Sequence, residues 1–204
     1  MCTRHKQRGI SLVELIMFIV IVSVALAGIL LVMNVTTRNS AAPLIHKQAL
    51  AIAESLLEEV ELMPFTYCDP DDPTATTATS ATIGPGACTV RVESLGPDAA
   101  FAPYQTAAET RNSATTPFDN VNDYNGFNSV AEGGIKDITG NAIAALSGYS
   151  ATVVVAPQAL GGIAATDVNG APQSLLIKVT VTGPDTVPVV VEGIRTRYAP
   201  RTTP

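Results

Sequence analysis

The sequence predicts an α+β fold in which a long N-terminal helix packs against a C-terminal antiparallel β-sheet head. The 24 residues from Ile10 to Met33 are almost entirely apolar, and an amphipathic stretch follows them and ends at Pro64. Segments rich in β-branched residues then alternate with Gly- and Pro-containing turns. Only 15% of the residues are charged, which suits strands and loops better than a soluble helical bundle.

The first helical half is predicted to span a membrane. Ile10 to Met33 exceeds the roughly 20 residues that cross the hydrocarbon core as a helix. Four basic side chains precede it, namely Arg4, His5, Lys6 and Arg8. No comparable cluster follows Met33. The positive-inside rule therefore predicts a cytoplasmic N-terminus and an exported remainder. The expected cleavage point, after Gly9, precedes the apolar run. A secretory signal instead has a shorter apolar run and is cut after it.

One charge, Glu14, lies inside this span. A charge at the centre of a membrane helix costs roughly 2.5 to 3.5 kcal/mol on insertion scales, which calls for a partner. Cleavage after Gly9 would expose the α-amino group of Ile10, and a neighbouring chain could bring the same group to Glu14. The alternative is a tolerated charge near the helix N-terminus, which the helix dipole also favours.

These residues carry a resemblance to a known family. KQRG followed by ISLVELIMFIVIVSVALAGILL resembles the class III signal of type IV prepilins and type II secretion pseudopilins. The resemblance implies that prepilin peptidase recognises Gly9, that Ile10 becomes an N-methylated terminus, and that Glu14 contacts a neighbour's amine. It also implies a pilin-like helix carrying a meander sheet, anchored in the bacterial inner membrane. Ile10 stands where the family usually has Phe.

The second helical half, up to Met63, is predicted to support the head. Pro43 suggests a kink or brief break before it, and Pro64 should end it. Its apolar face should comprise Leu44, Ile45, Leu50, Ala53, Leu56, Leu57 and Val60. The run of Glu58, Glu59 and Glu61 could be paired catalytic carboxylates or metal ligands, but no partner lies at a defined spacing, which favours a solvated face.

Cys68 and Cys88 are predicted to form a disulfide. Cys2 belongs to the leader, which leaves an even pair in an exported segment. A metal pair is the alternative, and it lacks further Cys or His at ligand spacing. The bond would close a Thr- and Pro-rich loop that includes TATTATSAT, either flexible surface or a glycan acceptor.

Four strands are predicted in the head, and together they would form one antiparallel sheet packed on the amphipathic helix. They are Cys88 to Leu95, Tyr149 to Ala156, Ser174 to Thr182 and Val189 to Tyr198. The predicted organisation is a leader (1–9), a membrane helix (10–33), a stem (34–63) and a periplasmic or extracellular head (64–204).

The segment Phe118 to Gly134 is rich in acidic and amide oxygens around Gly126. Calcium binds such loops, and the candidate ligands are Asp119, Asp123, Asn125 and Glu132. An EF-hand frame fails because Val121 occupies its first ligand position. The alternative is an Asx-turn loop whose side chains bond their own backbone. No other cofactor is expected.

A second resemblance joins this segment to the stem. FDNVNDYNGF and QALAIAESLLEEV resemble minor pilins of the mannose-sensitive haemagglutinin (MSHA) pilus group, of the MshD-like kind. The resemblance implies a structural and assembly subunit, with other pilin subunits, prepilin peptidase and the inner-membrane assembly platform as partners. A minor pseudopilin of a type II secretion system and a tip adhesin on a pilin stem are the alternatives.

Charge and composition bear on the remaining function classes. Loss of Arg4, Lys6 and Arg8 with the leader leaves 9 basic against 18 acidic residues, a net charge of −9. Nucleic acid is therefore not an expected partner. His46 would be the only histidine left after cleavage. No set of nucleophile and base and no phosphate-binding loop is recognisable, so no enzymatic activity is expected.

Overall fold

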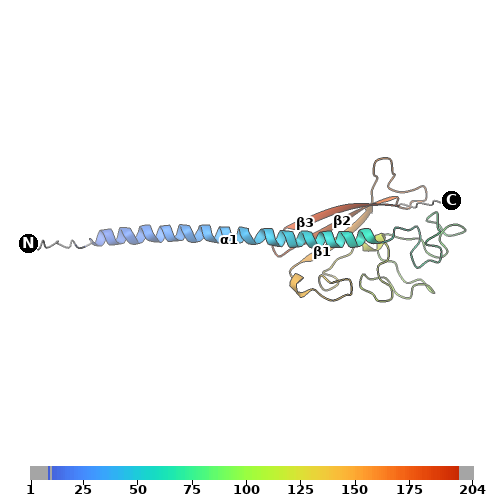
Figure 1. Cartoon of the computed structure of the whole chain (residues 1–204), viewed down its shortest axis with the longest axis horizontal. Helices are drawn as coiled ribbons and strands as arrows, with labels where there is room; N and C mark the ends of the chain where they lie inside the picture. The colour runs from blue at the N-terminus through green and yellow to red at the C-terminus, as the bar shows by residue number, and fades with distance from the viewer. Residues whose placement is uncertain (1–8, 10, 198–204) are drawn as a thin grey trace, which may run out of the picture. The chain divides into compact units, whose positions relative to one another are not determined.

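The structure, a computed structural model, describes Gly9 and residues 11–197. Its one long helix is α1 (Leu12–Leu62), followed by the short 3₁₀ helices η1 (Val121–Tyr124) and η2 (Ala144–Leu146). The strands β1 (Ser150–Pro157), β2 (Ser174–Thr182) and β3 (Pro188–Thr196) complete the fold (Figure 1). The chain divides into two compact units, Met1–Leu44 and Ile45–Pro204. The α+β class and the long apolar N-terminal helix are as predicted.

Helix α1 runs through Pro43 without interruption, so the predicted break is wrong. Proline removes one backbone hydrogen bond and crowds the preceding turn, but the helical bonds on either side remain available. The predicted end of the helix is confirmed, because α1 stops at Leu62, two residues before Pro64.

The sheet of the second unit is an antiparallel meander in the order β1-β2-β3. Val153 pairs with Val179, and Val179 pairs with Val191 on the other side, so β2 is the central strand. Alternate residues of β1 are buried, namely Ala151, Val153 and Val155. The three predicted strands in this region are found within a residue or two, although Tyr198 lies outside the described residues.

The fourth predicted strand, Cys88 to Leu95, is not a strand. This segment makes only the isolated bridges Cys68↔Val92 and Ile83↔Cys88. The backbone amides of Thr89, Val90 and Arg91 instead donate to the carboxylate of Asp72, at 3.1, 2.6 and 2.9 Å. A buried side chain therefore takes the donors that a strand would give to a neighbouring strand.

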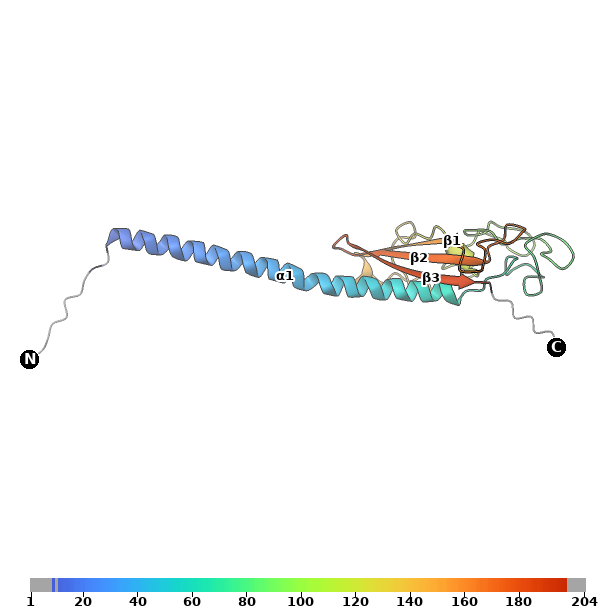
Figure 2. The ribbon, with the colours of Figure 1, turned by 90° about the horizontal axis from the view of Figure 1, so that it is seen from above.

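The core of the head lies between the sheet and the C-terminal part of α1, as Figure 2 shows. The helix contributes Ala49, Ala53, Leu56 and Val60, which are spaced to lie on one face. The small alanine side chains allow the sheet to pack close to the helix. The sheet contributes Val153, Val155, Leu175, Ile177, Val179 and Val181. Leu44 and Leu50, which were predicted on this face, are exposed, because the buried face is centred on Ala49 and Ala53 instead.

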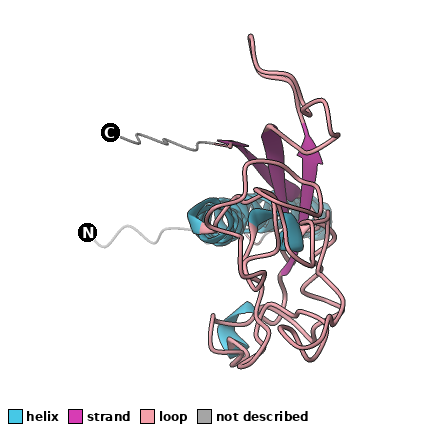
Figure 3. Ribbon diagram, turned by 90° about the vertical axis from the view of Figure 1, so that its right-hand side faces the viewer, coloured by secondary structure: helices cyan, strands magenta, loops and turns pink. Residues whose placement is uncertain are grey.

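Most of the head outside the helix and sheet consists of loops (Figure 3). Cys68 and Cys88 form a disulfide with a Cα–Cα distance of 5.4 Å, which closes the loop that the sequence predicts it to close. Both cysteines are buried and pack with Ala75 and Ala78 in a second, smaller core.

Candidate functional site

The N-terminal motif residues lie at the start of α1. Gly9 is exposed and precedes the helix, which begins at Leu12. Glu14 is exposed in the first helical turn, where the positive end of the helix dipole favours an acidic side chain. Ile10 lies outside the described residues. No described residue covers Gly9 or Glu14, so another protein can reach both.

The helix that follows is long and apolar enough to cross a membrane. Within the described residues, Leu12–Val35 is the one such span, with 24 residues and a mean hydropathy of 3.2. None of this span is buried against the chain itself. An apolar helix without intramolecular cover needs lipid or other helices around it.

The stem helix is joined to a loop of the head through Glu59. Arg111 donates from Nε and Nη2 to the two carboxylate oxygens of Glu59, at 2.7 and 2.6 Å. The hydroxyl of Tyr124 also donates to Oε1 of Glu59, at 2.7 Å. Burial raises the pKa of Tyr124 well above its ordinary value, and the Glu59 carboxylate raises it further. The prediction of a solvated face is therefore wrong for Glu59.

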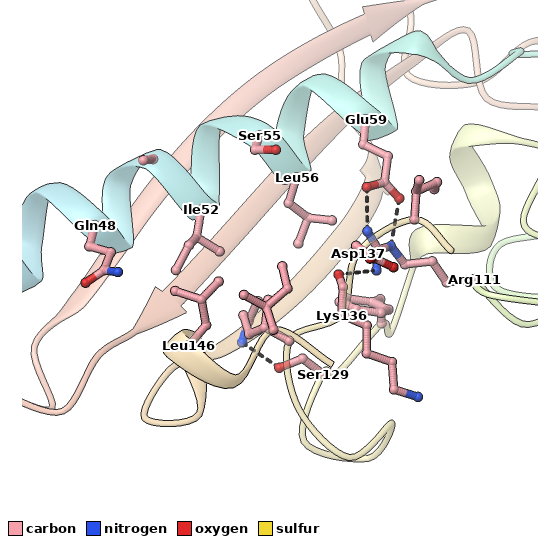
Figure 4. A pocket seen from close by; sticks show the side chains of 16 residues that line it. Gln48, Ile52, Ser55, Leu56, Glu59, Arg111, Ser129, Lys136, Asp137 and Leu146 are labelled. Atoms are coloured by element: carbon pink, nitrogen blue, oxygen red, sulfur yellow. Dashed lines mark hydrogen bonds and ion pairs between the residues drawn. The ribbon is translucent and has the colours of Figure 1, made fainter. Parts of the chain in front are cut away.

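A pocket of about 460 Å³ opens beside this ion pair (Figure 4). Ile52 and Leu56 of α1 face Leu146 of η2 across it, and Glu59 and Arg111 lie at one end. Its walls are mostly apolar, and none of the described residues that line it is a histidine or a cysteine. The pocket therefore offers a mostly apolar surface that ends at the ion pair of Glu59 and Arg111.

The oxygen-rich segment forms a buried cap rather than an open loop. Asn120 begins η1 with a capping box, in which Oδ2 of Asp123 accepts from the backbone amides of Asp119 and Asn120 at 2.9 and 2.7 Å. Oδ1 of Asn125 accepts from the amide of Val155 on β1, at 3.1 Å. The bonds of Asp123 to the nearby backbone match the Asx-turn alternative, whereas the bond of Asn125 joins the segment to β1.

The four predicted calcium ligands are only partly brought together. Asp119 lies beside Asp69 and Glu109, with one carboxylate oxygen of each within 4.8 Å of the others. Asp123 is buried next to this group, whereas Asn125 and Glu132 have partners elsewhere. Oε2 of Glu132 accepts from the side-chain amide of Asn112 at 3.2 Å.

Burial and mutual repulsion shift the pKa values of these acids upward. Desolvation first, and then nearby carboxylates, raise the pKa of Asp119 to about 7 and that of Glu109 to about 8. Desolvation likewise raises the pKa of Asp123 to about 7, although two backbone hydrogen bonds oppose it. For these carboxylates, burial therefore outweighs the interactions that favour the charged form.

Sequence reasoning missed Asp69, Glu109 and Arg111 as residues of interest. Asp69 is 50 residues before Asp119 in the sequence (119 − 69), and Arg111 is 52 residues after Glu59 of α1. Their spacing matches no motif, and only the folding of the loops brings them together. An isolated acidic residue in a Pro-rich loop gives no signal of its own.

The fold and the N-terminal site define a membrane-anchored protein in which an exposed apolar helix carries a compact α+β head. Residues 4–30 match the family model of the prokaryotic N-terminal methylation motif. The match includes Gly9 and Glu14 and supports a precursor of the type IV pilin or pseudopilin type, a structural rather than an enzymatic class. No curated protein and no solved structure matches the chain.

Proposed function

We propose that this chain is a minor pilin of an MSHA-type type IV pilus. Prepilin peptidase cuts it after Gly9, Ile10 becomes the methylated N-terminus, and the apolar helix holds it in the inner membrane with its head in the periplasm. The assembly platform then moves it into the filament, where the helix packs among those of other subunits. The methylation motif at residues 4–30, which continues into the exposed apolar helix, carries this proposal.

The finer assignment to the MSHA group rests on the resemblance of two stretches of the sequence, which lie together in the head. The two stretches that carry that resemblance, 48–60 and 118–127, contact each other, because the hydroxyl of Tyr124 donates to Oε1 of Glu59 at 2.7 Å. Both stretches contribute to one core cluster. The two stretches therefore form the two sides of one junction between stem and head. The resemblance to MSHA minor pilins covers both sides of that junction.

Maturation is tested by intact mass and N-terminal sequencing of the chain from membranes with and without prepilin peptidase. Peptidase-positive cells should yield a chain of 195 residues that starts at Ile10 and carries one extra methyl group, since nine of 204 residues are removed. Gly9→Ala should block the cut and serves as the control. A chain that keeps Met1 in peptidase-positive cells would contradict the proposal.

The alternatives are separated by a deletion strain. A minor pilin of the MSHA type predicts fewer sheared surface pili with normal protein secretion. A minor pseudopilin predicts the opposite pattern, and a tip adhesin predicts normal pilus number with reduced surface attachment. Complementation with the wild-type chain controls for effects on neighbouring genes.

A further inference from the structure

A cluster of carboxylates lies where three loops of the head meet. Asp69 belongs to the disulfide-closed loop, Glu109 to the loop before Arg111, and Asp119 to the segment that leads into η1. One carboxylate oxygen from each lies within 4.8 Å of the other two. Asp69 is fully buried, Glu109 is buried and Asp119 is half-buried. The three side chains thus converge on one small volume.

Further acids, among them Asp98 and Asp123, lie beside this volume. Arg91 is the arginine that interacts with Asp98, Asp69 and Glu109. The backbone amide of Asp98 donates to Oε2 of Glu109 at 2.9 Å, and Oδ2 of Asp123 accepts from the amide of Asp119 at 2.9 Å. Arg91 pairs with Asp98 at 2.8 Å. The other ion pairs among the described residues involve Glu59 and Glu192, outside this cluster.

Several buried oxygens of the cluster also lack a hydrogen-bond partner among the described residues. They are Oδ2 of Asp69, Oδ2 of Asp98 and Oδ1 of Asp119, and the side chains of Asp69 and Asp98 are 0% and 1% exposed. Buried polar atoms are nearly always paired in folded proteins, so unpaired oxygens on converging carboxylates call for a hydrogen-bond donor or a cation. This observation is independent of the number of acids in the cluster.

We propose that Asp69, Glu109 and Asp119 bind one calcium ion. Calcium takes oxygen ligands at 2.3 to 2.6 Å, so the oxygens around one ion stand up to about 5 Å apart, which accommodates the observed separation. Magnesium demands a tighter octahedron, and zinc prefers nitrogen and sulfur ligands, which this group does not contain. Asp123 acts as a positioning residue, because it holds the backbone that carries Asp119.

A bound ion would join three loops that share little regular secondary structure. Without it, repulsion among the converging carboxylates opposes the folded arrangement. With it, the same carboxylates hold the loops together. The inference does not depend on the proposed role in a pilus.

The test is isothermal titration of the full-length chain in detergent, stripped with EDTA at pH 7.5, with calcium chloride or magnesium chloride up to about 1 mM, the range of extracellular calcium sites. Wild type should bind one calcium ion per chain and melt at a higher temperature with calcium. Asp119→Asn should weaken calcium binding at least tenfold. Glu58→Gln, which removes the same charge from an exposed position on α1, should bind as wild type does.

The melting temperature is a second readout, which distinguishes loss of calcium binding from misfolding of Asp119→Asn. In EDTA, Asp119→Asn should melt at or above the wild-type temperature, because it removes a repelled charge while keeping the shape of the side chain. Added calcium should raise the melting temperature of wild type and Glu58→Gln but not of Asp119→Asn. Absence of calcium binding to wild type, binding that Asp119→Asn retains, or equal affinity for magnesium would each overturn the inference.

Discussion

Glu59 of α1 and Arg111 of a distant loop form a two-armed ion pair, with both guanidinium to carboxylate distances below 2.8 Å. The Arg111 side chain is 7% exposed and that of Glu59 is 18% exposed. The guanidinium also lies 5.6 Å from the centre of the Phe127 ring and donates to the carbonyl of Lys136 at 3.2 Å. This one arginine therefore connects the stem to two loops of the head.

Removing Arg111 should destabilise the head. Arg111→Met leaves the largely buried Glu59 carboxylate without its cation, so we expect a loss of about 2 to 4 kcal/mol in the free energy of unfolding. Chemical denaturation of the full chain in detergent measures it. The exposed pair Lys178 and Glu192, at 3.4 Å, is the control, and Lys178→Met should cost less than about 1 kcal/mol. Equal losses at the two sites would contradict the assigned role.

Gly183 should not tolerate a side chain. A Cβ atom there would lie 2.7 Å from Cγ2 of Ile45 on α1 and 3.0 Å from Cε1 of Tyr149. We expect Gly183→Ala to lower the free energy of unfolding by about 1 to 3 kcal/mol through overpacking. Gly162→Ala is the matched control, because no atom lies within 4 Å of its Cβ position. A harmless Gly183→Ala would mean that the helix and sheet are packed less closely than described.

Asp72 should make stability depend on acid pH. Burial alone would raise its pKa, but hydrogen bonds from the amides of Arg91, Thr74 and Val90 outweigh it, and the net pKa falls well below the ordinary value. A lowered folded-state pKa contributes stability that is present above the unfolded value of about 3.9 and is lost as pH falls through the folded value.

Asp72→Asn isolates this contribution. It should cost about 2 to 4 kcal/mol at pH 7, because several donors lose a charged acceptor. The difference between wild type and Asp72→Asn should shrink as the pH falls below about 4. Unfolding of both chains measured from pH 2 to pH 7 provides the check, and a difference that stays constant across this range would exclude the linkage.

The disulfide should stabilise the head by restricting its unfolded chain. Cys68 and Cys88 are 20 residues apart, and a loop of that size gives about 3 kcal/mol in the chain-entropy model. We expect Cys68→Ser with Cys88→Ser to lose about this much in thermal or denaturant unfolding. Reduced wild type should match the double variant, and the double variant itself should be insensitive to reductant.

Glu14 should matter for assembly and not for cleavage. The cost of leaving its charge unpaired in the membrane, about 2.5 to 3.5 kcal/mol, corresponds to more than about a tenfold change in an equilibrium. Glu14→Ala should therefore be cut after Gly9 as usual but reach the sheared filament fraction at about a tenth of the wild-type level or less. Glu54→Ala, exposed on the stem, is the control. Normal incorporation of Glu14→Ala would refute the pairing with a neighbour's amine.

Local patterns allowed much of the scaffold to be predicted. The apolar run that contains Leu12–Val35 is explicit in composition, and Pro64 marks the end of α1 because its chemistry acts on the adjacent residues. The alternation of β-branched residues predicted β1 to β3, because strand preference also depends on neighbouring residues. The prediction for Cys88 to Leu95 failed because the acceptor for its amides, Asp72, is a distant side chain that propensity does not represent.

The sequence by itself determined the apolar anchor, the N-terminal methylation motif, the α+β class and the cysteine pair, since each depends on composition or on the order of neighbouring residues. Only the tertiary structure decided that the buried face of α1 includes Ala49 and leaves out Leu44 and Leu50. It also decided the pairing of Glu59 with Arg111 and the convergence of Asp69, Glu109 and Asp119. These depend on how loops far apart in the chain close onto one another. Loop closure is set by the summed packing and hydrogen bonding of the whole head, which no local pattern records.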